Sequence, residues 1–432
     1  MKRVLVLLLA LLVAASAFAS GAKEQAAKEK KIGGAIAFWT FLDPKDPGPR
    51  SVVQQKFIQE FEQKYNAKVD VIYKNWAEIP NDFIRAVSGG TAPDVTRLSM
   101  PKGWQLMLAA DTIAPLSDYT EFTEADKKDW LLDWNSTVKD GKKYSLPIEH
   151  RFMTLWLNPE HMAKIGATPP ISWEDLRTKA VKLSQMGNVG YAIGIGRLTE
   201  VNGLMEFFDC AYYGLGKATV DGKGYATWGD TDEAVKVMET LKKMVDTGAV
   251  PKEVLAWSVD DSYKGFVAGK VSIVNYGTQR VFTAIKSGMK PQIVAIPGFK
   301  DNVPSPAYTS GWHLVMAKTS KNPATAAEFC KYMTSTEAQI ENARLAGEMP
   351  SRISPYKDPW FATDPNGKEM MVWQELLFKV GASLDFFEDW LNMRYALSDA
   401  AQEIILKNAP IKETLKKHAD IFNKAHAEIA PK

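Results

Sequence analysis

The stretch GGAIAFWTFLDPKD, residues 33–46, indicates both the kind of fold and the kind of site that this chain forms. Its apolar run at residues 35–38 predicts a short buried strand. In a dinucleotide-binding fold, glycines follow such a strand and let the backbone approach a phosphate. Here Trp39, Phe41 and Asp43 follow instead. Aromatic rings beside a carboxylate indicate a ligand that has both an apolar face and hydrogen-bonding groups.

Helix and strand patterns alternate from this stretch onward. Residues 51–65 have apolar side chains at helical spacing, and Ser51 is the expected N-cap. The following segments predict a strand, a helix that ends at two glycines, and another strand; they are residues 67–76, 79–90 and 92–99. This order predicts an α/β fold with parallel strands covered by helices. Because ligands bind at the carboxyl ends of such strands, Trp39, Trp76 and Arg97 are candidate site residues.

The same alternation continues to the end of the chain. Strands are expected within residues 144–158, 269–277, 291–298 and 313–318. Helices are expected at residues 171–187, 230–248 and 322–335, with Ser172 capping the first, Gly248 ending the second and Pro323 opening the third. The last hundred residues are expected to be largely helical, and no internal repeat is found.

Composition and the pattern of the N-terminal residues together predict an exported globular protein. Its 432 residues are enough for two or three domains, and 46% apolar with 24% charged residues is ordinary for a soluble protein. Residues 1–19 have a basic start, a short apolar run and Ala17-Phe18-Ala19, which predicts a cleaved signal peptide. Residues 20–31 predict a disordered leader. Because Ser20 rather than Cys follows the signal, we expect a soluble periplasmic or extracellular protein with no lipid anchor.

Charge argues against two classes of partner. Without Lys2 and Arg3, the 53 basic residues fall to 51, which equals the number of acidic residues. Nucleic acids and anionic membranes require concentrated positive charge, so neither is an expected partner.

Motifs for enzymes, metals and cofactors are missing from the sequence. No Walker-type loop, HExxH helix or GxSxG turn occurs, and the five histidines do not stand at ligand spacing. We therefore expect no catalytic residue, no metal and no cofactor. A secreted carbohydrate-active enzyme stays open as an alternative, because paired carboxylates such as Asp260 and Asp261 can act far apart in sequence.

Aromatic residues are abundant, at 11% of the chain with 13 tryptophans. Most tryptophans pack in cores. Trp39, Trp76 and Trp312 differ, because each falls where a strand meets a loop. For these three, ligand contact and packing both stay open.

Several segments together resemble a known family. They are IAFWTF, FIQEFEQKYNAKVDVIY, AVSGGTAPDVTRL, DGKKYSLPIEHRFMTLWLNPEHMAKIGATPPISWEDL, FVAGKVSIVNYG, SGWHLVMAKTSKNPATAAEF and EMPSR. In order and spacing they resemble the extracellular solute-binding proteins of ABC importers, in the carbohydrate-binding group that includes maltose-binding proteins. The resemblance implies two α/β lobes of the type II periplasmic-binding-protein fold, with the ligand in a cleft between them.

The resemblance also implies where the lobes divide. One lobe is expected to contain residues 32–148 and 308–349, and the other residues 149–307 and 350–432, with crossings near residues 148–151, 297–311 and 350–351. This division puts Cys210 and Cys330 on different lobes. A disulfide between them would lock the hinge, so we expect two buried free thiols.

The implied function is high-affinity binding of a sugar or oligosaccharide and its delivery to an ABC permease, by a monomer that breaks no bond. A polyol phosphate, a uronate or another small solute stays open as the ligand. The expected ligand-binding residues are aromatic rings and polar or charged groups near the cleft. They are Trp39, Phe41, Asp43, Lys45, Trp76, Arg97, Glu149, Arg151, Tyr276, Gln279, Ser310, Trp312, Arg352, Trp390 and Arg394.

Overall fold

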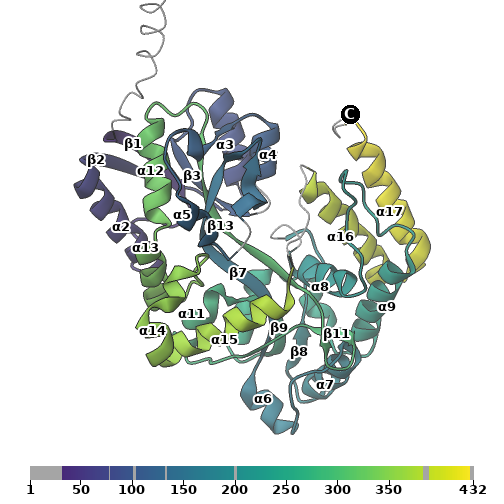
Figure 1. The fold of residues 1–432 in the computed structure, drawn as a ribbon. Helices are drawn as coiled ribbons and strands as arrows, with labels where there is room; N and C mark the ends of the chain where they lie inside the picture. Colours follow the sequence, from purple (N-terminus) through teal and green to yellow (C-terminus); the bar gives the residue numbers. More distant parts are fainter. Residues whose placement is uncertain are drawn as a thin grey trace, which may run out of the picture.

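The computed structural model describes residues 32–76, 78–100, 104–131, 134–198, 202–382 and 389–428 (Figure 1). The predicted signal peptide and leader lie outside these ranges. Among the described helices, none is both long enough and apolar enough to cross a bilayer.

The strands are short except for two. They are β1 Gly34–Thr40, β2 Ala67–Tyr73, β3 Val95–Met100, β4 Ile113–Ala114, β5 Val138–Lys139, β6 Lys142–Lys143, β7 Ser145–Leu157, β8 Val189–Ala192, β9 Val271–Gly277, β10 Gln292–Val294, β11 Pro297–Lys300, β12 Val303–Pro304, β13 Ala307–Ala317 and β14 Gly381–Ala382. The long strands are β7 and β13.

Helices separate most of the strands and fill the C-terminal quarter. They are α2 Pro49–Tyr65, α3 Ile79–Ser88, α4 Trp104–Ala109, α5 Glu124–Lys128, α6 Pro159–Lys164, α7 Trp173–Gln185, α8 Asn202–Tyr213, α9 Asp232–Asp246, α10 Val259–Val267, α11 Val281–Lys286, α12 Pro323–Met333, α13 Thr336–Glu341, α14 Pro359–Thr363, α15 Pro365–Val380, α16 Trp390–Lys407 and α17 Ile411–His426. A π-helical turn, Asn342–Ala346, follows α13.

One continuous path of hydrogen-bonded strands runs in the order β2-β1-β3-β13-β7-β9-β8. β1 pairs in parallel with β2 and β3, and β8 pairs in parallel with β9. The central strands β13 and β7 are antiparallel to each other and to their outer neighbours. The predicted α/β class is therefore confirmed, with a mixed rather than an all-parallel sheet.

The two central strands connect two bodies of the molecule, which Figure 1 shows at either end of β7. In the first body, Ile36 and Phe38 of β1 pack with α2 and α12, whereas Trp39 points to the opposite face and packs with α3. In the second body, alternate residues of β7 enter two further cores. This alternation is the period-two pattern of a strand buried on both faces.

A third segment passes beside the central strands. Met349 forms a β-bridge with His150 of β7, and Ser351 Oγ donates to the carbonyl of Pro147 at 2.8 Å. The three expected crossings thus lie next to one another. The exact residues at which the two lobes divide stay a prediction.

Local expectations from sequence hold with one correction. Ser172 caps α7 through Asp175 N, Gly248 follows the end of α9, and Pro323 is the first residue of α12. Ser51 is not the N-cap of α2. The helix starts earlier, with Gly48 as the cap and Pro49 as the first residue, because proline has the helical φ and lacks the N–H that the first turn cannot use.

Both cysteines are free and buried, as predicted. Cys210, on α8, lies in one core, and Cys330, on α12, lies in the separate core that α12 forms with α2 and β1.

Candidate binding site

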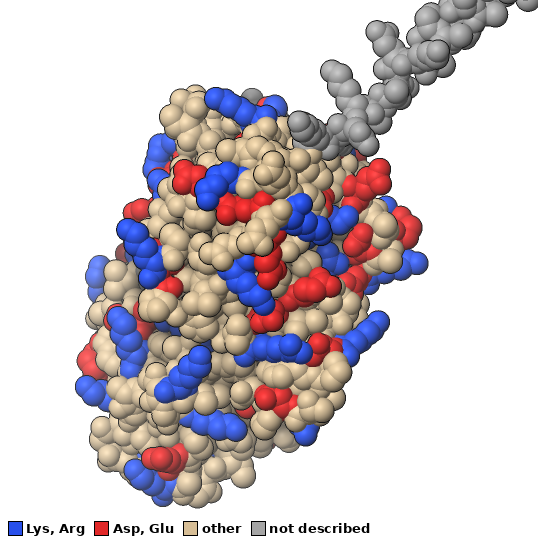
Figure 2. Space-filling view, turned by 90° about the vertical axis from the view of Figure 1, so that its left-hand side faces the viewer, with Lys and Arg blue, Asp and Glu red and all other residues tan. Residues whose placement is uncertain are grey.

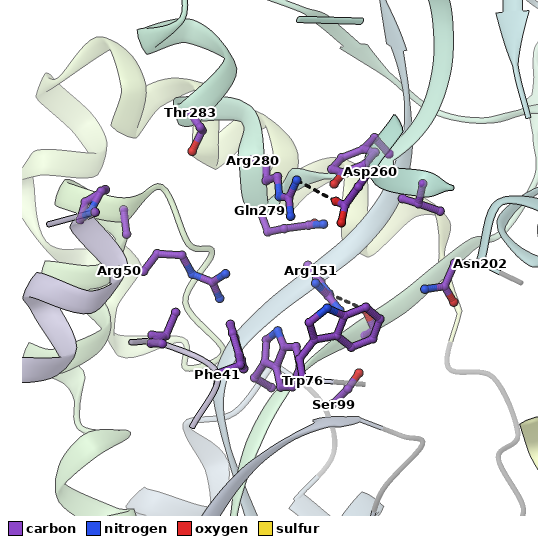
Figure 3. Close-up of a pocket in the computed structure, with 18 of the residues that line it drawn as sticks. Phe41, Arg50, Trp76, Ser99, Arg151, Asn202, Asp260, Gln279, Arg280 and Thr283 are labelled. Atoms are coloured by element: carbon purple, nitrogen blue, oxygen red, sulfur yellow. Dashed lines mark hydrogen bonds and ion pairs between the residues drawn. The ribbon is translucent and has the colours of Figure 1, made fainter. Parts of the chain in front are cut away.

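A cavity of about 410 Å³ opens where the two bodies meet the central strands (Figure 3). Its lining residues come from the loop after β1, from β3, β7, β9 and β13, and from the starts of several helices. They are Phe41, Leu42, Asp46, Gly48, Pro49, Arg50, Trp76, Ser99, Arg151, Met153, Asn202, Glu206, Val259, Asp260, Tyr276, Gln279, Arg280, Thr283, Ser310, Trp312 and Ala346. The volume falls within the range of small-molecule sites.

Strand geometry explains how the central part of this lining arises. Arg151 and Met153 are two residues apart on β7, as are Ser310 and Trp312 on β13, so each pair shares a face of its strand. Ser310 pairs directly with Arg151 across the two strands. A β-bulge beside Trp312 shifts the register, a feature that re-aims side chains next to sites.

The two strands approach closely at Gly311. A Cβ atom on this residue would lie 2.3 Å from the carbonyl oxygen of Glu149, so only glycine allows the observed spacing. The close approach brings the cavity residues of β13 beside those of β7.

Three aromatic side chains form one wall. The rings of Phe41 and Trp312 have centroids 4.0 Å apart, and Trp76 stands at 89° to Trp312 with centroids 6.4 Å apart. Trp312 is buried, while Phe41 and Trp76 are half-buried. We call Phe41, Trp76 and Trp312 the aromatic wall. It presents an apolar surface against which the flat face of a ligand can pack.

Tyr276 and Gln279 line the cavity from the second body. The Tyr276 ring packs on Tyr263, with centroids 5.1 Å apart, and meets Trp156 edge-on at 5.3 Å. Burial raises the pKa of the Tyr276 hydroxyl, so the group stays neutral. Gln279 Oε1 is buried and accepts no hydrogen bond from the described residues.

A cluster of four buried charged side chains stands beside the aromatic wall. Glu149 Oε2 accepts hydrogen bonds from Arg50 Nη2 at 2.8 Å and from Arg97 Nη2 at 2.9 Å. Glu348 accepts from Arg50 Nε and lies 3.8 Å from Arg97 Nη2. We call Arg50, Arg97, Glu149 and Glu348 the ionic cluster. It joins α2, β3, β7 and the segment after the π-helical turn, and so ties the first body to two of the crossings.

The two carboxyl groups of the ionic cluster are not equivalent. Burial raises the pKa of Glu348 to about 8, and the neighbouring Glu149 adds to this effect against the opposing influence of Arg50. Burial also opposes ionisation of Glu149, but Arg50, a hydrogen bond from Glu348 and Arg97 lower its pKa below the ordinary value. Glu149 Oε1 is buried and accepts no hydrogen bond from an amine, amide or guanidinium donor of the described residues, which leaves it to a protonated Glu348 beside it. At neutral pH, Glu149 is the ionised member.

Gly347 allows the backbone turn that places Glu348 in the ionic cluster. Its φ of 71° is in the left-handed region, and a Cβ atom there would lie 2.5 Å from the Phe282 ring. The π-helical turn therefore needs glycine at its end.

Two further arginines reach the cavity. Arg151 Nε donates to Ser310 Oγ at 2.8 Å, and its guanidinium lies 5.7 Å from the centre of the Trp312 ring. Arg280 pairs with Asp260 at 2.8 Å and lies over Tyr263. Figure 3 shows Arg50 and Arg151 extending toward the same space, with Asn202 on the far side from Arg50.

The structure brings seven of the predicted site residues to the cavity. They are Phe41, Trp76, Arg151, Tyr276, Gln279, Ser310 and Trp312. Arg97 and Glu149 do not line it, because they are buried against each other. Arg97 lies over Phe41 and Trp312, with its guanidinium carbon 4.8 and 5.9 Å from the ring centres, and so supports the aromatic wall.

Trp39, Asp43 and Lys45 lie outside the cavity. Trp39 is the strand residue on the face toward α3, where it packs edge-on against Phe83. Asp43 accepts a hydrogen bond from Lys45 N at 2.8 Å and thereby shapes the loop after β1, while the Lys45 side chain is exposed. These three residues are not brought together with the aromatic wall.

Arg352, Trp390 and Arg394 also lie outside the cavity. Arg352 is buried over Trp130 and donates to Thr334 O at 2.7 Å, so it fixes the third crossing to its neighbours. Arg394 stacks on Trp390 at 3.4 Å. Its Nη1 donates at 2.7 Å to Asn202 Oδ1, and Asn202 lines the cavity, so Arg394 can act only through Asn202.

Sequence reasoning missed several lining residues and half of the ionic cluster. Arg50 and Glu348 are the most important omissions. Arg50 directly follows Gly48-Pro49, a helix-start signal at the carboxyl end of β1, and Glu348 opens the quoted segment EMPSR. Both signals were present in the sequence, but Arg50 lies 99 residues from Glu149 and 298 residues from Glu348 along the chain, so local patterns do not reveal these contacts.

Within the described ranges, no group of three His, Cys, Asp or Glu side chains stands close enough to hold a metal ion. The chemistry of the cavity is therefore carried by aromatic rings, guanidinium groups, carboxylates and amides.

Comparison with known proteins agrees with this architecture. The solved structure of an ABC transporter solute-binding protein from Thermotoga lettingae, bound to α-D-tagatose, superposes with a TM-score of 0.77 at 18% identity, over 91% of this chain and all of the other. The maltotriose-binding protein of Thermus thermophilus bound to maltotriose superposes with a TM-score of 0.74 at 19% identity, over 90% and 99%. At these identities the likeness establishes the fold.

Sequence relatives match over a shorter stretch. A binding protein of Brucella abortus (strain 2308) is 26% identical over 229 residues, which are 50% of this chain and 53% of the relative. The "Probable ABC transporter-binding protein" of Deinococcus radiodurans is 26% identical over 236 residues, or 52% and 54%. The chain thus spans about half the length of the curated relatives it matches.

The family profile described as "Bacterial extracellular solute-binding protein" matches residues 56–369, which is well over half of the sequence. This range includes most of the cavity lining. The chain belongs to the bacterial extracellular solute-binding protein family.

Proposed function

We propose that this protein binds a sugar or an oligosaccharide in the cavity and delivers it to an ABC-type permease. The observation that carries the proposal is the aromatic wall of Phe41, Trp76 and Trp312, which faces hydrogen-bonding groups across one cavity. A pyranose ring has apolar C–H faces and a belt of hydroxyls around its edge. Rings for the faces and polar groups for the edge together fit a saccharide better than a purely apolar or purely charged ligand.

Relatives with the same fold support this choice. The Thermotoga lettingae protein is bound to α-D-tagatose and the Thermus thermophilus protein to maltotriose. Both ligands are carbohydrates, whereas one sequence relative from Sinorhizobium fredii is named for amino-acid transport. The aromatic wall favours the carbohydrate alternative for this chain.

Ligand size follows from simple arithmetic. Micromolar affinity corresponds to about 8 kcal/mol. At about 0.3 kcal/mol per heavy atom, a disaccharide of about two dozen atoms reaches that value. The cavity volume of about 410 Å³ accommodates a ligand of this class.

Lobe closure couples binding to delivery. The cavity lining comes from both bodies, so a ligand makes its full set of contacts only when they are close together. A ligand that binds the closed state better shifts the population toward it. We propose lobes of residues 32–148 with 308–349 and residues 149–307 with 350–432, which act as a monomer outside the cytoplasmic membrane after signal-peptide cleavage. The closed surface then docks on the permease.

A thermal-shift screen of the purified protein against mono- and oligosaccharides tests the proposal, because a specific ligand raises the melting temperature by mass action. The expected result is a saturable rise with at least one saccharide. If only amino acids, peptides or amines raise the melting temperature, the proposal is wrong.

Matched tryptophan variants then locate the site. Trp76→Ala should abolish the saccharide-induced shift. Trp360→Ala, at an equally half-buried tryptophan of α14 away from the cavity, should leave the shift intact. Equal loss in both variants would remove the aromatic wall from the proposed site.

A further inference from the structure

Arg151 is a cavity residue with no counter-charge in contact. Its Nε donates to Ser310 Oγ at 2.8 Å, and no carboxylate of the described residues lies within 4.0 Å of its guanidinium. The two Nη groups, with their four N–H donors, stay free for a ligand. Figure 3 shows the Arg151 side chain in the middle of the lining.

Arg50 adds a second cation on the same side. It uses Nε and Nη2 on Glu348 and Glu149, and its Nη1 has no hydrogen-bond partner among the described residues. The side chain is 24% exposed, so it is the member of the ionic cluster that reaches the cavity.

Negative charge near these guanidiniums is insufficient to balance them. Glu149 is shared by Arg50, Arg97 and Arg151, all three of which lower its pKa. Glu348 holds its proton at neutral pH because burial and Glu149 raise its pKa. Three cations therefore face about one carboxylate.

None of the remaining acidic residues in the described lining forms an ion pair with Arg151. Asp260 is paired with Arg280 at 2.8 Å. Asp46 is exposed and accepts a hydrogen bond from Gly48 N. Glu206 comes from α8, the helix that also supplies Asn202, and lies near enough to Tyr276 to add to the rise in the Tyr276 pKa that burial causes. A carboxylate and an amide there suit sugar hydroxyls.

We infer that the saccharide bound in this cavity carries an anionic group, the carboxylate of a uronate or the phosphate of a sugar phosphate, and that Arg151 binds this group with Arg50 beside it. The inference rests on the proposed function and narrows its ligand class. A guanidinium fork matches the paired oxygens of either anion, and its hydrogen bonds to a charged acceptor are about twice as strong as neutral ones. A neutral sugar leaves the Arg151 guanidinium without a charged acceptor.

Calorimetric titration with matched ligands tests the inference. The series are glucose, glucuronate and glucose 6-phosphate; galactose and galacturonate; and digalacturonate beside neutral disaccharides. The acidic member of one series should bind about 10-fold to 100-fold tighter than its neutral counterpart, the range expected for hydrogen bonds to a charged group. Its affinity should fall as salt rises, since the pair is partly solvent-accessible. The uronate and phosphate arms identify which anion is preferred.

Variants separate Arg151 from a general charge effect. Arg151→Gln should bring acidic and neutral ligands to similar affinity, and Arg151→Lys should restore part of the preference. The control Arg177→Gln removes an equal charge from an ion pair with Glu174 on α7, outside the cavity, and should leave the preference unchanged. Melting temperatures of all variants confirm that they are folded.

The outcomes are distinct. Tight binding of neutral saccharides with no preference for acidic ones would overturn this inference and leave the proposed function standing. An acidic preference that persists in Arg151→Gln would overturn the role of Arg151. Failure of every saccharide, neutral and acidic, would overturn the proposed function and this inference with it.

Discussion

Replacing either glutamate of the ionic cluster by glutamine should have very different consequences. Glu149→Gln removes the carboxylate that accepts hydrogen bonds from Arg50 at 2.8 Å and Arg97 at 2.9 Å. Each bond to a charged partner contributes about 1.5–3 kcal/mol. Arg97 is only 2% exposed and would keep only Glu348, 3.8 Å away, as an acidic neighbour, so the total loss should be about 3–5 kcal/mol.

Glu348→Gln should cost less than about 1 kcal/mol at pH 6, because glutamine has the shape of the protonated side chain that is present there. The assay is urea unfolding of wild type and both variants, followed by circular dichroism. Similar losses in both variants would refute the assignment of the charge to Glu149. A loss below about 1 kcal/mol for Glu149→Gln would show that the cluster does not depend on an ionised carboxylate.

Three further predictions test other parts of the structure. Because the pKa of Glu348 is raised to about 8, its proton stabilises the folded state fully below about pH 4.5, the ordinary value, and this contribution is lost as the pH rises through about 8. In urea unfolding between about pH 5 and about pH 9, the free energy of unfolding should therefore fall less in Glu348→Gln than in wild type, and an equal fall would contradict the raised pKa. Trp39→Ala should lower the free energy of unfolding by about 3–5 kcal/mol, because Trp39 packs in the core with α3. The folded variant should bind the saccharide with wild-type affinity in calorimetry, and lost affinity would place Trp39 in the site. Gly347→Ala should lower the free energy of unfolding by about 1–3 kcal/mol, because the residue has a left-handed backbone and lies against the Phe282 ring. Gly90→Ala, at a positive φ with no neighbouring atom within 4 Å, should lower it less in the same urea assay, and equal losses would show that the ring contact is unimportant.

The fold could be predicted largely from local patterns. Each strand and helix of the first body carries its own periodicity and its own stop signal, as in the glycines after α3. The resemblance of ordered segments supplied the two-lobed arrangement, which the solved relatives share. The pairing of β7 with β13 could not be predicted from the sequence, because the paired residues are about 160 positions apart and a bulge interrupts their register.

The site could be predicted only in part. Residues that follow a strand, such as Phe41 and Trp76, reach the cavity as their position suggested. Trp39 does not, because a shift of one position along a strand turns the side chain to the other face. Arg97 and Glu149 were expected to bind the ligand directly, but each other's charge satisfies them, and this pairing depends on a fold that brings residues 52 positions apart into contact.

The charge distribution agrees with a protein that recognises its ligand inside a cavity rather than on its surface. Figure 2 shows basic and acidic side chains interspersed over one face of the molecule. Such a mixed surface does not concentrate positive charge for a polyanionic partner. The guanidinium of Arg151, which is bonded to Ser310 and to no carboxylate of the described residues, lies inside the cavity.

Native mass spectrometry of the protein after incubation with its preferred saccharide tests the central claim most directly. The account predicts one adduct per chain whose mass is that of the intact saccharide, and loss of this adduct in Trp76→Ala. Masses of cleaved saccharide, or an adduct that the Trp76 substitution leaves unchanged, would contradict it.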